Sequence, residues 1–241
     1  MHDFRRWRDR LREKADNPAA RPALYVAIGD SVTHGIMEGE VLEHERVYHQ
    51  LLRKRIAKRY PNSVLNVINS GVSGDTAHRS RERWAHDVIC YKPDLVTIKF
   101  GLNDAHGGEE GVKPYIAAIR DLVRLIRNET DAELLLMTPS MMMKRDNAFI
   151  SEEHRRHVPT FLKVYEEGHL LRYVEALRSF AASDGLPLLD VYAMWERMEA
   201  EGVDIHTRLS NGINHPDRQF HEELAEALEA FLFAGDSVPD R

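Results

Sequence analysis

The sequence is poor in cysteine, contains no long apolar run and carries no excess of positive charge. Its one cysteine, Cys90, excludes an internal disulfide framework, and its apolar neighbours predict a small buried residue rather than a nucleophile. No apolar stretch approaches the length of a membrane span, and the first residues show no apolar signal core. A formal net charge of −6 gives no reason to expect nucleic acid as a partner. We therefore expect a cytoplasmic protein with neither membrane nor nucleic-acid partners.

The composition fits one globular domain. The chain has 241 residues, of which 43% are hydrophobic and 30% charged, enough to bury a full core and stay soluble. We find no internal repeat, low-complexity tract or linker, and predict a single domain over residues 1–241. Apolar positions are sparse in residues 2–15, so residues 1–20 are expected to form a loosely packed helical arm that ends at Asn17-Pro18.

Short apolar runs alternate with stretches of helical period. The runs are rich in Val, Ile and Leu and do not alternate with polar residues, as is typical of buried parallel strands. Expected strands cover residues 23–28, 64–68, 94–100, 133–137 and 186–191. Expected helices cover residues 42–59, 76–90, 112–127 and 160–183, with a last helix that begins near Pro216. This order predicts a doubly wound sheet with helices on both faces.

Three polar turns follow expected strands, and a fourth precedes the last helix. They are Gly29-Asp30-Ser31, residues 73–76 (Ser-Gly-Asp-Thr), residues 101–104 (Gly-Leu-Asn-Asp) and Asn214-His215-Pro216. In sheets of this kind ligands bind outside the carboxyl ends of the strands. The four turns therefore predict one active-site edge.

Ser31 and His215 are the candidates for nucleophile and base. A serine hydroxyl reacts only when a base removes its proton, and a histidine on a distant loop is suited to that task. Ser31 could instead simply cap the helix that follows it. The pair predicts acyl transfer to Ser31, with His215 moving the proton.

A developing oxyanion needs hydrogen-bond donors, and three candidates follow the strands. The backbone N–H groups of Ser31 and Gly74 and the side-chain amide of Asn103 could together form an oxyanion hole. Gly74 could instead serve a turn of positive φ, and Asn103 could bond its own backbone. Three carboxylates beside these residues are expected to hold the turns rigid by accepting backbone N–H bonds: Asp30, Asp75 and Asp104.

These four blocks, in this order, resemble the SGNH (GDSL-type) hydrolase family of esterases, lipases and acetylesterases. The resemblance spans about residues 23–232. It implies a flavodoxin-like three-layer α/β/α sandwich with a mainly parallel five-stranded sheet, and no metal or organic cofactor. It also implies a small-molecule ester as substrate, with small acyl groups, often on carbohydrate, as the closest match to the residues around Asn103 and His215.

One position departs from the family pattern. The family usually has an aspartate three residues before the histidine, where this chain has Gly212, with Asn211 one residue earlier. Asn211 could accept from the imidazole Nδ1–H through its carbonyl, so we expect Ser31, His215 and Asn211 to form the catalytic group. Alternatively Asp204 or Asp217 supplies the acid, or the enzyme is weakened or inactive.

Two alternative functions stay open. Residues 139–158 follow the fourth expected strand. Either some of the methionines Met141, Met142 and Met143 line an apolar pocket wall or a lid, or the segment is an ordinary surface loop that buries one methionine. Such a wall would suit a longer acyl chain, as in lysophospholipase or thioesterase relatives. A protein that lost the acid could also bind its ligand without turnover. Nucleotide binding is disfavoured because neither Gly-x-Gly-x-x-Gly nor a P-loop occurs. Metal hydrolysis is disfavoured because His154 and His157 have no acidic partner set.

Overall fold

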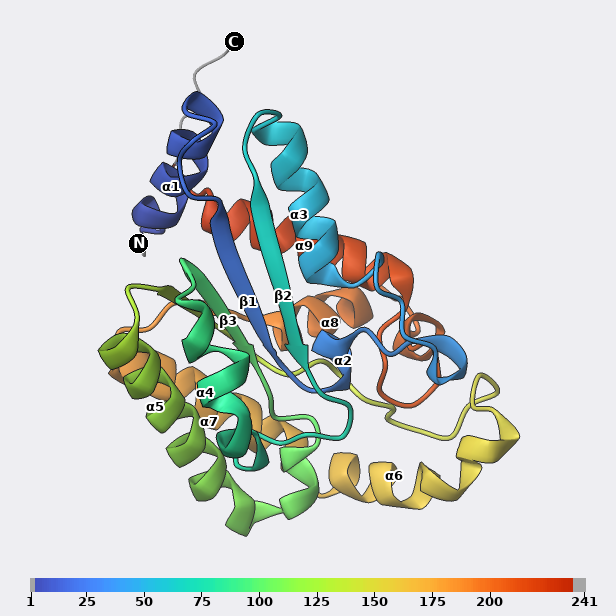
Figure 1. Cartoon of the computed structure of the whole chain (residues 1–241). Helices are drawn as coiled ribbons and strands as arrows, with labels where there is room; N and C mark the ends of the chain where they lie inside the picture. Colours follow the sequence, from blue (N-terminus) through green and yellow to red (C-terminus); the bar gives the residue numbers. More distant parts are fainter. Residues whose placement is uncertain (1–2, 236–241) are drawn as a thin grey trace.

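The computed structural model describes residues 3–235 and has five parallel strands in the order β2-β1-β3-β4-β5 (Figure 1). The strands are β1 (Ala23–Gly29), β2 (Leu65–Gly71), β3 (Leu95–Lys99), β4 (Glu133–Met137) and β5 (Leu188–Leu189). All neighbouring pairs are parallel. The flavodoxin-like sandwich with a mainly parallel five-stranded sheet is confirmed; residues 1, 2 and 236–241 of the expected single domain lie outside the described part.

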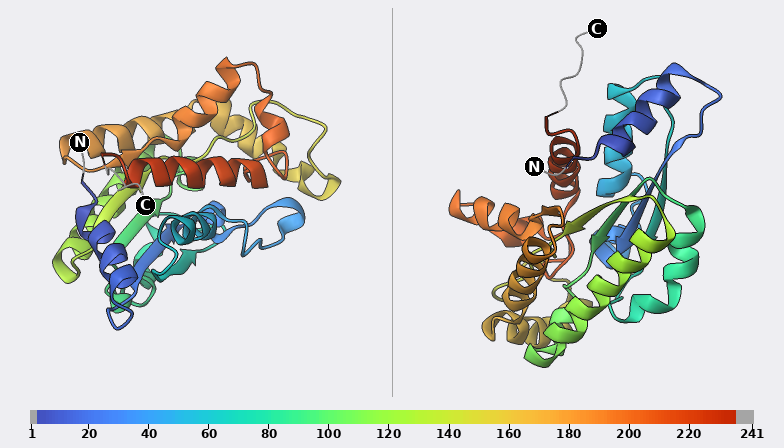
Figure 2. Two further views of the ribbon diagram at one scale, coloured as in Figure 1. Left: turned by 90° about the horizontal axis from the view of Figure 1, so that it is seen from above. Right: turned by 90° about the vertical axis from the view of Figure 1, so that its left-hand side faces the viewer.

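Helices cover both faces of the sheet. Helices α3 (Tyr48–Arg59) and α9 (Arg218–Leu232) pack together on one face, and α4 (Trp84–Asp87) and α5 (Val112–Glu129) lie on the other (Figures 1 and 2). The remaining helices are α1 (Arg5–Asp16), α2 (Ser31–His34), α6 (Val158–Glu166), α7 (His169–Ser183) and α8 (Val191–Ala200). Within residues 3–235 no helix combines the length and apolarity of a membrane span.

The N-terminal helix α1 is firmly packed, so the expectation of a loose arm is wrong. Trp7 and Leu11 have no exposed surface, and the backbone N–H of Trp7 donates to the carboxylate of Glu133 at 2.7 Å. The Arg8 guanidinium donates to the carbonyl of Leu232 at the end of α9. Few apolar residues suffice because each one is large and falls on the same side of the helix. The helix ends at Asn17 as expected.

Two expected helices are interrupted. Residues 76–90 form short turns around α4 instead of one helix, and the backbone of Val88, with φ −131° and ψ −59°, ends α4 after Asp87. The stretch 160–183 is divided into α6 and α7 at Gly168, whose φ of +68° is left-handed. Helix α3 begins at Tyr48 rather than at residue 42.

Two expectations about single side chains are also wrong. Met141, Met142 and Met143 are all buried in the core, so none lines an open pocket wall. Their segment belongs to no helix or strand, and all three side chains join the core cluster. Cys90 is exposed, because it lies in a short turn at the surface rather than in a helix facing the core.

Candidate active site

The sheet register brings three of the expected site segments to neighbouring positions. Gly29, the last residue of β1, pairs with Gly71 on β2 and with Lys99 on β3. Ser31 comes two residues after Gly29. Gly74 comes three residues after Gly71, and Asn103 comes four residues after Lys99. All three segments therefore leave the same edge of the sheet, at the carboxyl ends of adjacent strands (Figure 1).

Ser31 occupies the first turn of α2, directly after β1. The carboxylate of Asp30 caps this helix by accepting from the backbone N–H of Val32 at 3.0 Å. The turn lies tightly against β2, because a Cβ at Gly71 would come within 2.1 Å of the backbone nitrogen of His34. The turn therefore depends on a glycine in the adjacent strand, and it holds Ser31 nearly buried, at 3% exposure.

His215 comes from the loop between α8 and α9 and reaches Ser31. Its Nε2 lies 3.0 Å from the Ser31 Oγ, so nucleophile and base candidates are within hydrogen-bond distance. Burial, and to a lesser degree the nearby His154, lowers the pKa of His215 to about 4. At neutral pH the ring is therefore uncharged, as a general base must be before it accepts a proton.

Asn211 contacts His215 as expected, but with the opposite end of its amide. The Asn211 Nδ2 lies 3.2 Å from the ring Nδ1, whereas its Oδ1 accepts from three backbone N–H groups of its own loop. The expected bond from the ring Nδ1–H to the Asn211 carbonyl is therefore absent. The reason is local, because the Asn211 Oδ1 already accepts from the backbone N–H groups of this turn and faces away from the ring.

The two alternative acids are engaged on other partners. Asp204 accepts from His206 at 2.6 Å and from Arg145 at 2.7 Å. Asp217 caps α9 at the backbone N–H of Phe220 and accepts from Arg208. Neither aspartate is bonded to His215, whereas Asn211 contacts its Nδ1.

Gly74 and Asn103 lie on loops that contact each other. The Asn103 Nδ2 donates to the carbonyl of Asp75 at 2.9 Å, which ties the turn after β3 to the turn after β2. Gly74 has φ +73°, and a Cβ there would meet nothing within 4 Å. A positive φ favours glycine, and the open space leaves its N–H approachable. Their role as oxyanion donors, with the Ser31 N–H, stays a prediction.

The three carboxylates beside these residues hold the turns, as expected. Asp75 accepts from the N–H of Thr76, and Asp104 accepts from Ala77 and Gly101. Burial raises the pKa of Asp104 to about 7. Burial also raises the pKa of Asp30, while the ammonium of Lys99 opposes that rise.

Two cations at this edge escaped the sequence analysis. The Arg83 guanidinium bonds the carbonyls of Ser70 and Gly29 and the carboxylate of Asp75, so it joins β1, β2 and the loop that carries Gly74. Lys99 is fully buried and donates to the Ser140 Oγ at 3.1 Å, and burial lowers its pKa to about 8. Lys99 had a visible signal, since it is the one charged residue within the apolar run that forms β3.

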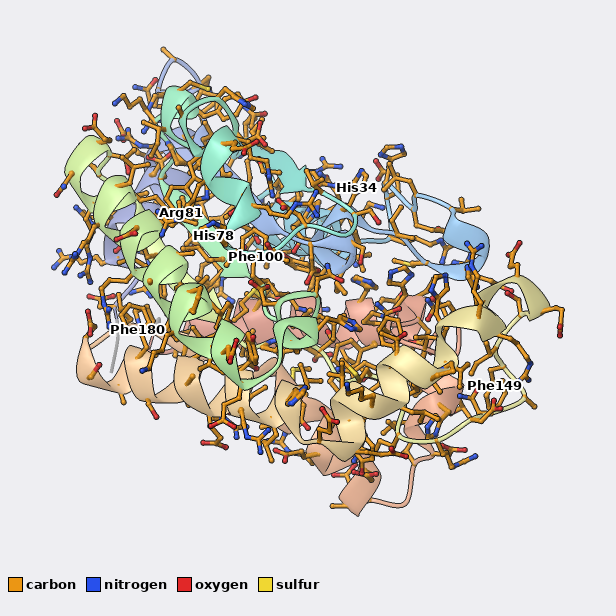
Figure 3. All side chains as sticks on the ribbon, turned by 90° about the horizontal axis from the view of Figure 1, so that it is seen from below. His34, His78, Arg81, Phe100, Phe149 and Phe180 are labelled. Atoms are coloured by element: carbon orange, nitrogen blue, oxygen red, sulfur yellow. The ribbon has the colours of Figure 1, made fainter. Side chains whose placement is uncertain are left out.

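Residues 139–157 hold the loop of His215 from outside. The N–H of Met143 donates to the carbonyl of Ile213 at 2.6 Å, and the Asn147 amide donates to that of Gly212 at 2.9 Å. Phe149 is exposed in this segment, and the view from below shows it beside the helical turns that precede α6, away from His34 of α2 (Figure 3). Two hydrogen bonds therefore tie this segment to the loop that carries His215.

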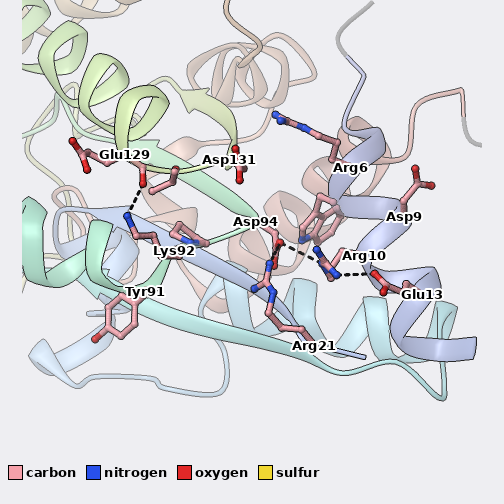
Figure 4. Close-up of a pocket in the computed structure, with 13 residues that line it drawn as sticks. Arg6, Asp9, Arg10, Glu13, Arg21, Tyr91, Lys92, Asp94, Glu129 and Asp131 are labelled. Atoms are coloured by element: carbon pink, nitrogen blue, oxygen red, sulfur yellow. Dashed lines mark hydrogen bonds and ion pairs between the residues drawn. The ribbon is translucent and has the colours of Figure 1, made fainter. Parts of the chain in front are cut away.

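A hollow of about 970 Å³ lies at the other end of the strands, beside α1 (Figure 4). Its charges pair with one another: Asp94 accepts from Arg21 at 2.5 Å, and Arg10 bonds Glu13 at 2.6 Å. None of the expected site residues lines it. Among the described side chains, no three of His, Cys, Asp or Glu gather so as to hold a metal ion.

Comparison with known proteins agrees with this geometry. The profile of the GDSL-like lipase/acylhydrolase family matches residues 27–222, which include the serine turn, both donor turns and the histidine loop. The chain belongs to this family of ester-cleaving hydrolases. Its resemblance to the SGNH (GDSL-type) hydrolases is thereby confirmed.

Individual relatives are more distant. An acetylxylan esterase from Geobacillus stearothermophilus is 47% identical over 45 residues, 19% of this chain and 20% of that protein. The uncharacterized lipoprotein YqeF of Bacillus subtilis (strain 168) is 33% identical over 95 residues, 39% of this chain and 37% of that protein. The chain thus matches well under half the length of these relatives.

Solved structures share the fold. A variant of an acetyl-xylooligosaccharide esterase from Geobacillus has a TM-score of 0.66 at 23% identity, covering 91% of this chain and 97% of that one. A lipase/acylhydrolase from Enterococcus faecalis has the same TM-score and identity, covering 91% and 99%.

Proposed function

We propose that this protein is a serine esterase that hydrolyses carboxylic esters of small acyl groups, with acetylated carbohydrate as the substrate class. The observation that carries the proposal is the 3.0 Å contact between Ser31 Oγ and His215 Nε2 at the carboxyl edge of the sheet. The family membership and the names of the acetylxylan and acetyl-xylooligosaccharide esterases support ester cleavage and the acetyl group.

The reaction proceeds by two acyl transfers. His215 Nε2 takes the hydroxyl proton as Ser31 Oγ attacks the ester carbonyl, and the oxyanion rests on the donors of Ser31, Gly74 and Asn103. The carbon–oxygen bond to the alcohol breaks, and the alcohol leaves with the proton from His215. Water then attacks the acyl-serine in the same way, releasing the carboxylic acid and restoring Ser31. Each step uses only residues of this chain and water.

The test is hydrolysis of nitrophenyl acetate and nitrophenyl octanoate by the wild type and by Ser31→Ala. We expect acetate to be preferred and turnover to vanish in the variant, with its melting temperature unchanged. Release of acetate from acetylated xylooligosaccharides by the wild type would then identify the carbohydrate class. Equal turnover in wild type and variant would overturn the serine mechanism, and a preference for octanoate would favour a lysophospholipase-type or thioesterase-type enzyme.

A ligand-binding protein without turnover is the second candidate, and the amide at the His215 Nδ1 is the observation that favours it. An aspartate-to-asparagine change in a serine-protease triad costs about 10⁴ in turnover. A folded wild type that binds acetylated oligosaccharide but releases no acetate would establish this candidate.

A further inference from the structure

The amide of Asn211 is held in one orientation by its own loop. Its Oδ1 accepts from the backbone N–H groups of Ile213, Asn214 and His215, at 3.0, 2.9 and 3.0 Å. Backbone N–H groups can only donate, so an amide turned by 180° would set its own N–H groups against three donors. The oxygen therefore faces the backbone, and the nitrogen faces the histidine ring.

The nitrogen of this amide has two hydrogens and two acceptors. Asn211 Nδ2 donates to the Asn214 Oδ1 at 3.0 Å and lies 3.2 Å from the His215 Nδ1. A donor there requires a bare Nδ1, and a neutral imidazole then carries its one proton on Nε2. We propose that Asn211 is a positioning residue that holds His215 in the Nε2–H tautomer, so that in the resting protein the ring donates to Ser31 Oγ rather than accepting its proton.

A carboxylate at the family's usual position would not fit this loop. Gly212 has φ +70°, and a Cβ there would come within 2.8 Å of the backbone of Phe149 and Ile150. Position 211, by contrast, already reaches the ring. Aspartate has the same shape as asparagine, so one oxygen at position 211 could keep the three backbone bonds while the other accepts from the His215 Nδ1–H.

This inference rests on the proposed function for its catalytic consequence. The ring is buried and uncharged near neutral pH, so its tautomer decides whether Nε2 presents a lone pair or a proton to Ser31. With Asn211, the base-competent tautomer loses its bond to the amide, and the imidazolium formed on proton transfer faces an N–H donor. Because a triad loses about 10⁴ in turnover with asparagine in place of aspartate, Asn211→Asp is expected to raise kcat by about 10²–10⁴.

The tautomer itself can be measured without any substrate. Protein labelled with ¹⁵N-histidine distinguishes a protonated ring nitrogen from a bare one by chemical shift and by coupling to the ring protons. For the wild type we expect a bare Nδ1 and a protonated Nε2 on His215, assigned by its loss in His215→Gln. A protonated Nδ1 in the wild type would overturn the proposal, whatever the enzyme does with esters.

Kinetics test the consequence with a matched control. Asn211→Asp should raise kcat for nitrophenyl acetate with little change in KM and should move the proton of His215 to Nδ1. Asn214→Asp adds the same charge one contact further from the ring and should raise kcat less than tenfold. Equal gains in both variants, or a folded Asn211→Asp that gains nothing while the wild type is active, would overturn the catalytic role. Mass spectrometry of the peptide with Asn211-Gly212 confirms that wild-type samples have not deamidated to aspartate.

Failure of the proposed esterase function can be distinguished from failure of the tautomer proposal. If wild type and Asn211→Asp both lack turnover while the spectrum shows the Nε2–H form, the esterase is excluded and the tautomer stands. If Asn211→Asp does not fold, as judged by its amide spectrum, the wild-type ¹⁵N experiment still decides the tautomer.

Discussion

The loop between α8 and α9 contains two buried histidines with opposite hydrogen-bond directions. The Nδ1 of His206 lies 2.6 Å from the carboxylate of Asp204, and its Nε2 accepts from the backbone N–H of Lys144 at 3.2 Å. His215 has an amide N–H at Nδ1 and the serine hydroxyl at Nε2. His206 must therefore carry its proton on Nδ1, and His215 on Nε2.

This difference shows that the partner of Nδ1 determines which ring nitrogen carries the proton. His206 has the arrangement that a general base needs, carboxylate at one nitrogen and lone pair at the other, yet its lone pair holds the backbone at Lys144. His215 has the nucleophile within reach of Nε2 and the amide nitrogen of Asn211 at Nδ1. The geometry of attack and the direction of the proton are therefore set by different residues in this loop, and each can be changed alone.

The largest effect should come from removing each ring in turn. His215→Gln is expected to lower kcat by about 10²–10⁴, since general base catalysis contributes that much. His206→Gln removes the contact to Lys144, so it should lower the free energy of unfolding by about 1–3 kcal/mol and change kcat less than tenfold. Nitrophenyl acetate kinetics and urea denaturation of both variants give the two numbers. A greater loss of kcat in His206→Gln would contradict the division of roles.

Acid should destabilise the protein through His215. Its pKa is lowered from 6.5 to about 4 by burial, so between these values the unfolded chain binds a proton that the folded chain does not. Stability is full above about pH 6.5 and is lost as the pH falls toward 4, by on the order of 3 kcal/mol. His49 and His221 act in the same direction, because burial lowers their pKa values to about 4 and about 3.

The variant His215→Gln separates the contribution of His215 to the acid sensitivity from that of the other groups. Urea denaturation at pH 7 and pH 4.5 should show a smaller loss in His215→Gln than in the wild type. Asn211→Asp should also lose less, because a carboxylate at Nδ1 raises the pKa of the ring toward its unfolded value. An equal loss in all three proteins would assign the acid sensitivity to His49, His221 and other groups.

A carboxylate at position 212 should not raise kcat, whereas a carboxylate at position 211 should. Gly212→Asp forces a side chain onto a left-handed residue and against the backbone of Phe149 and Ile150. We expect a loss of about 1–3 kcal/mol in the free energy of unfolding and no gain in kcat. Gly212→Ala is the matched control, since it adds the Cβ without the charge. A gain in kcat for Gly212→Asp would mean that the loop can rearrange to the usual family geometry.

Much of the fold could be predicted from the sequence because β1, β3 and β4 are almost entirely buried on both faces. Such strands read as continuous apolar runs, and four of the five expected runs became strands within a few residues of their ends. The fifth kept two residues, Leu188–Leu189, because Asp190 already caps α8. Parallel strands also share one carboxyl edge, so the positions of Ser31, Gly74 and Asn103 followed from the sheet.

The rest depended on contacts that periodicity does not contain. Three consecutive methionines are buried in a segment without regular secondary structure, which has no sequence period. The direction of the Asn211 amide depends on which of its atoms the backbone N–H groups of residues 213–215 face. The position of Asn211 beside His215 was therefore predictable, whereas the polarity of their contact was not.

The smallest effect should come from giving His206 the partner that His215 has. In the wild type one oxygen of Asp204 accepts from both the N–H and the Nδ1 of His206, while the other bonds the exposed Arg145. The carbonyl of an asparagine can accept both bonds from His206, because no other backbone donor competes for it among the contacts of Asp204 Oδ1 that the described residues show. Asp204→Asn should therefore cost about 1 kcal/mol or less, mainly from the exposed ion pair.

The ¹⁵N spectrum of Asp204→Asn should still show a protonated Nδ1 on His206. Asparagine at position 204 would then support the Nδ1–H tautomer of His206, whereas Asn211 supports the Nε2–H tautomer of His215. The difference would be that the oxygen accepts from the ring at position 204 and only from backbone N–H groups at position 211. A switch of His206 to the Nε2–H form, or a loss above about 3 kcal/mol, would contradict this explanation, because an unsatisfied buried polar group at the Lys144 N–H would cost about that much. In the expected case the backbone N–H groups of residues 213–215 determine the tautomer of His215, because they fix which end of the Asn211 amide faces the ring.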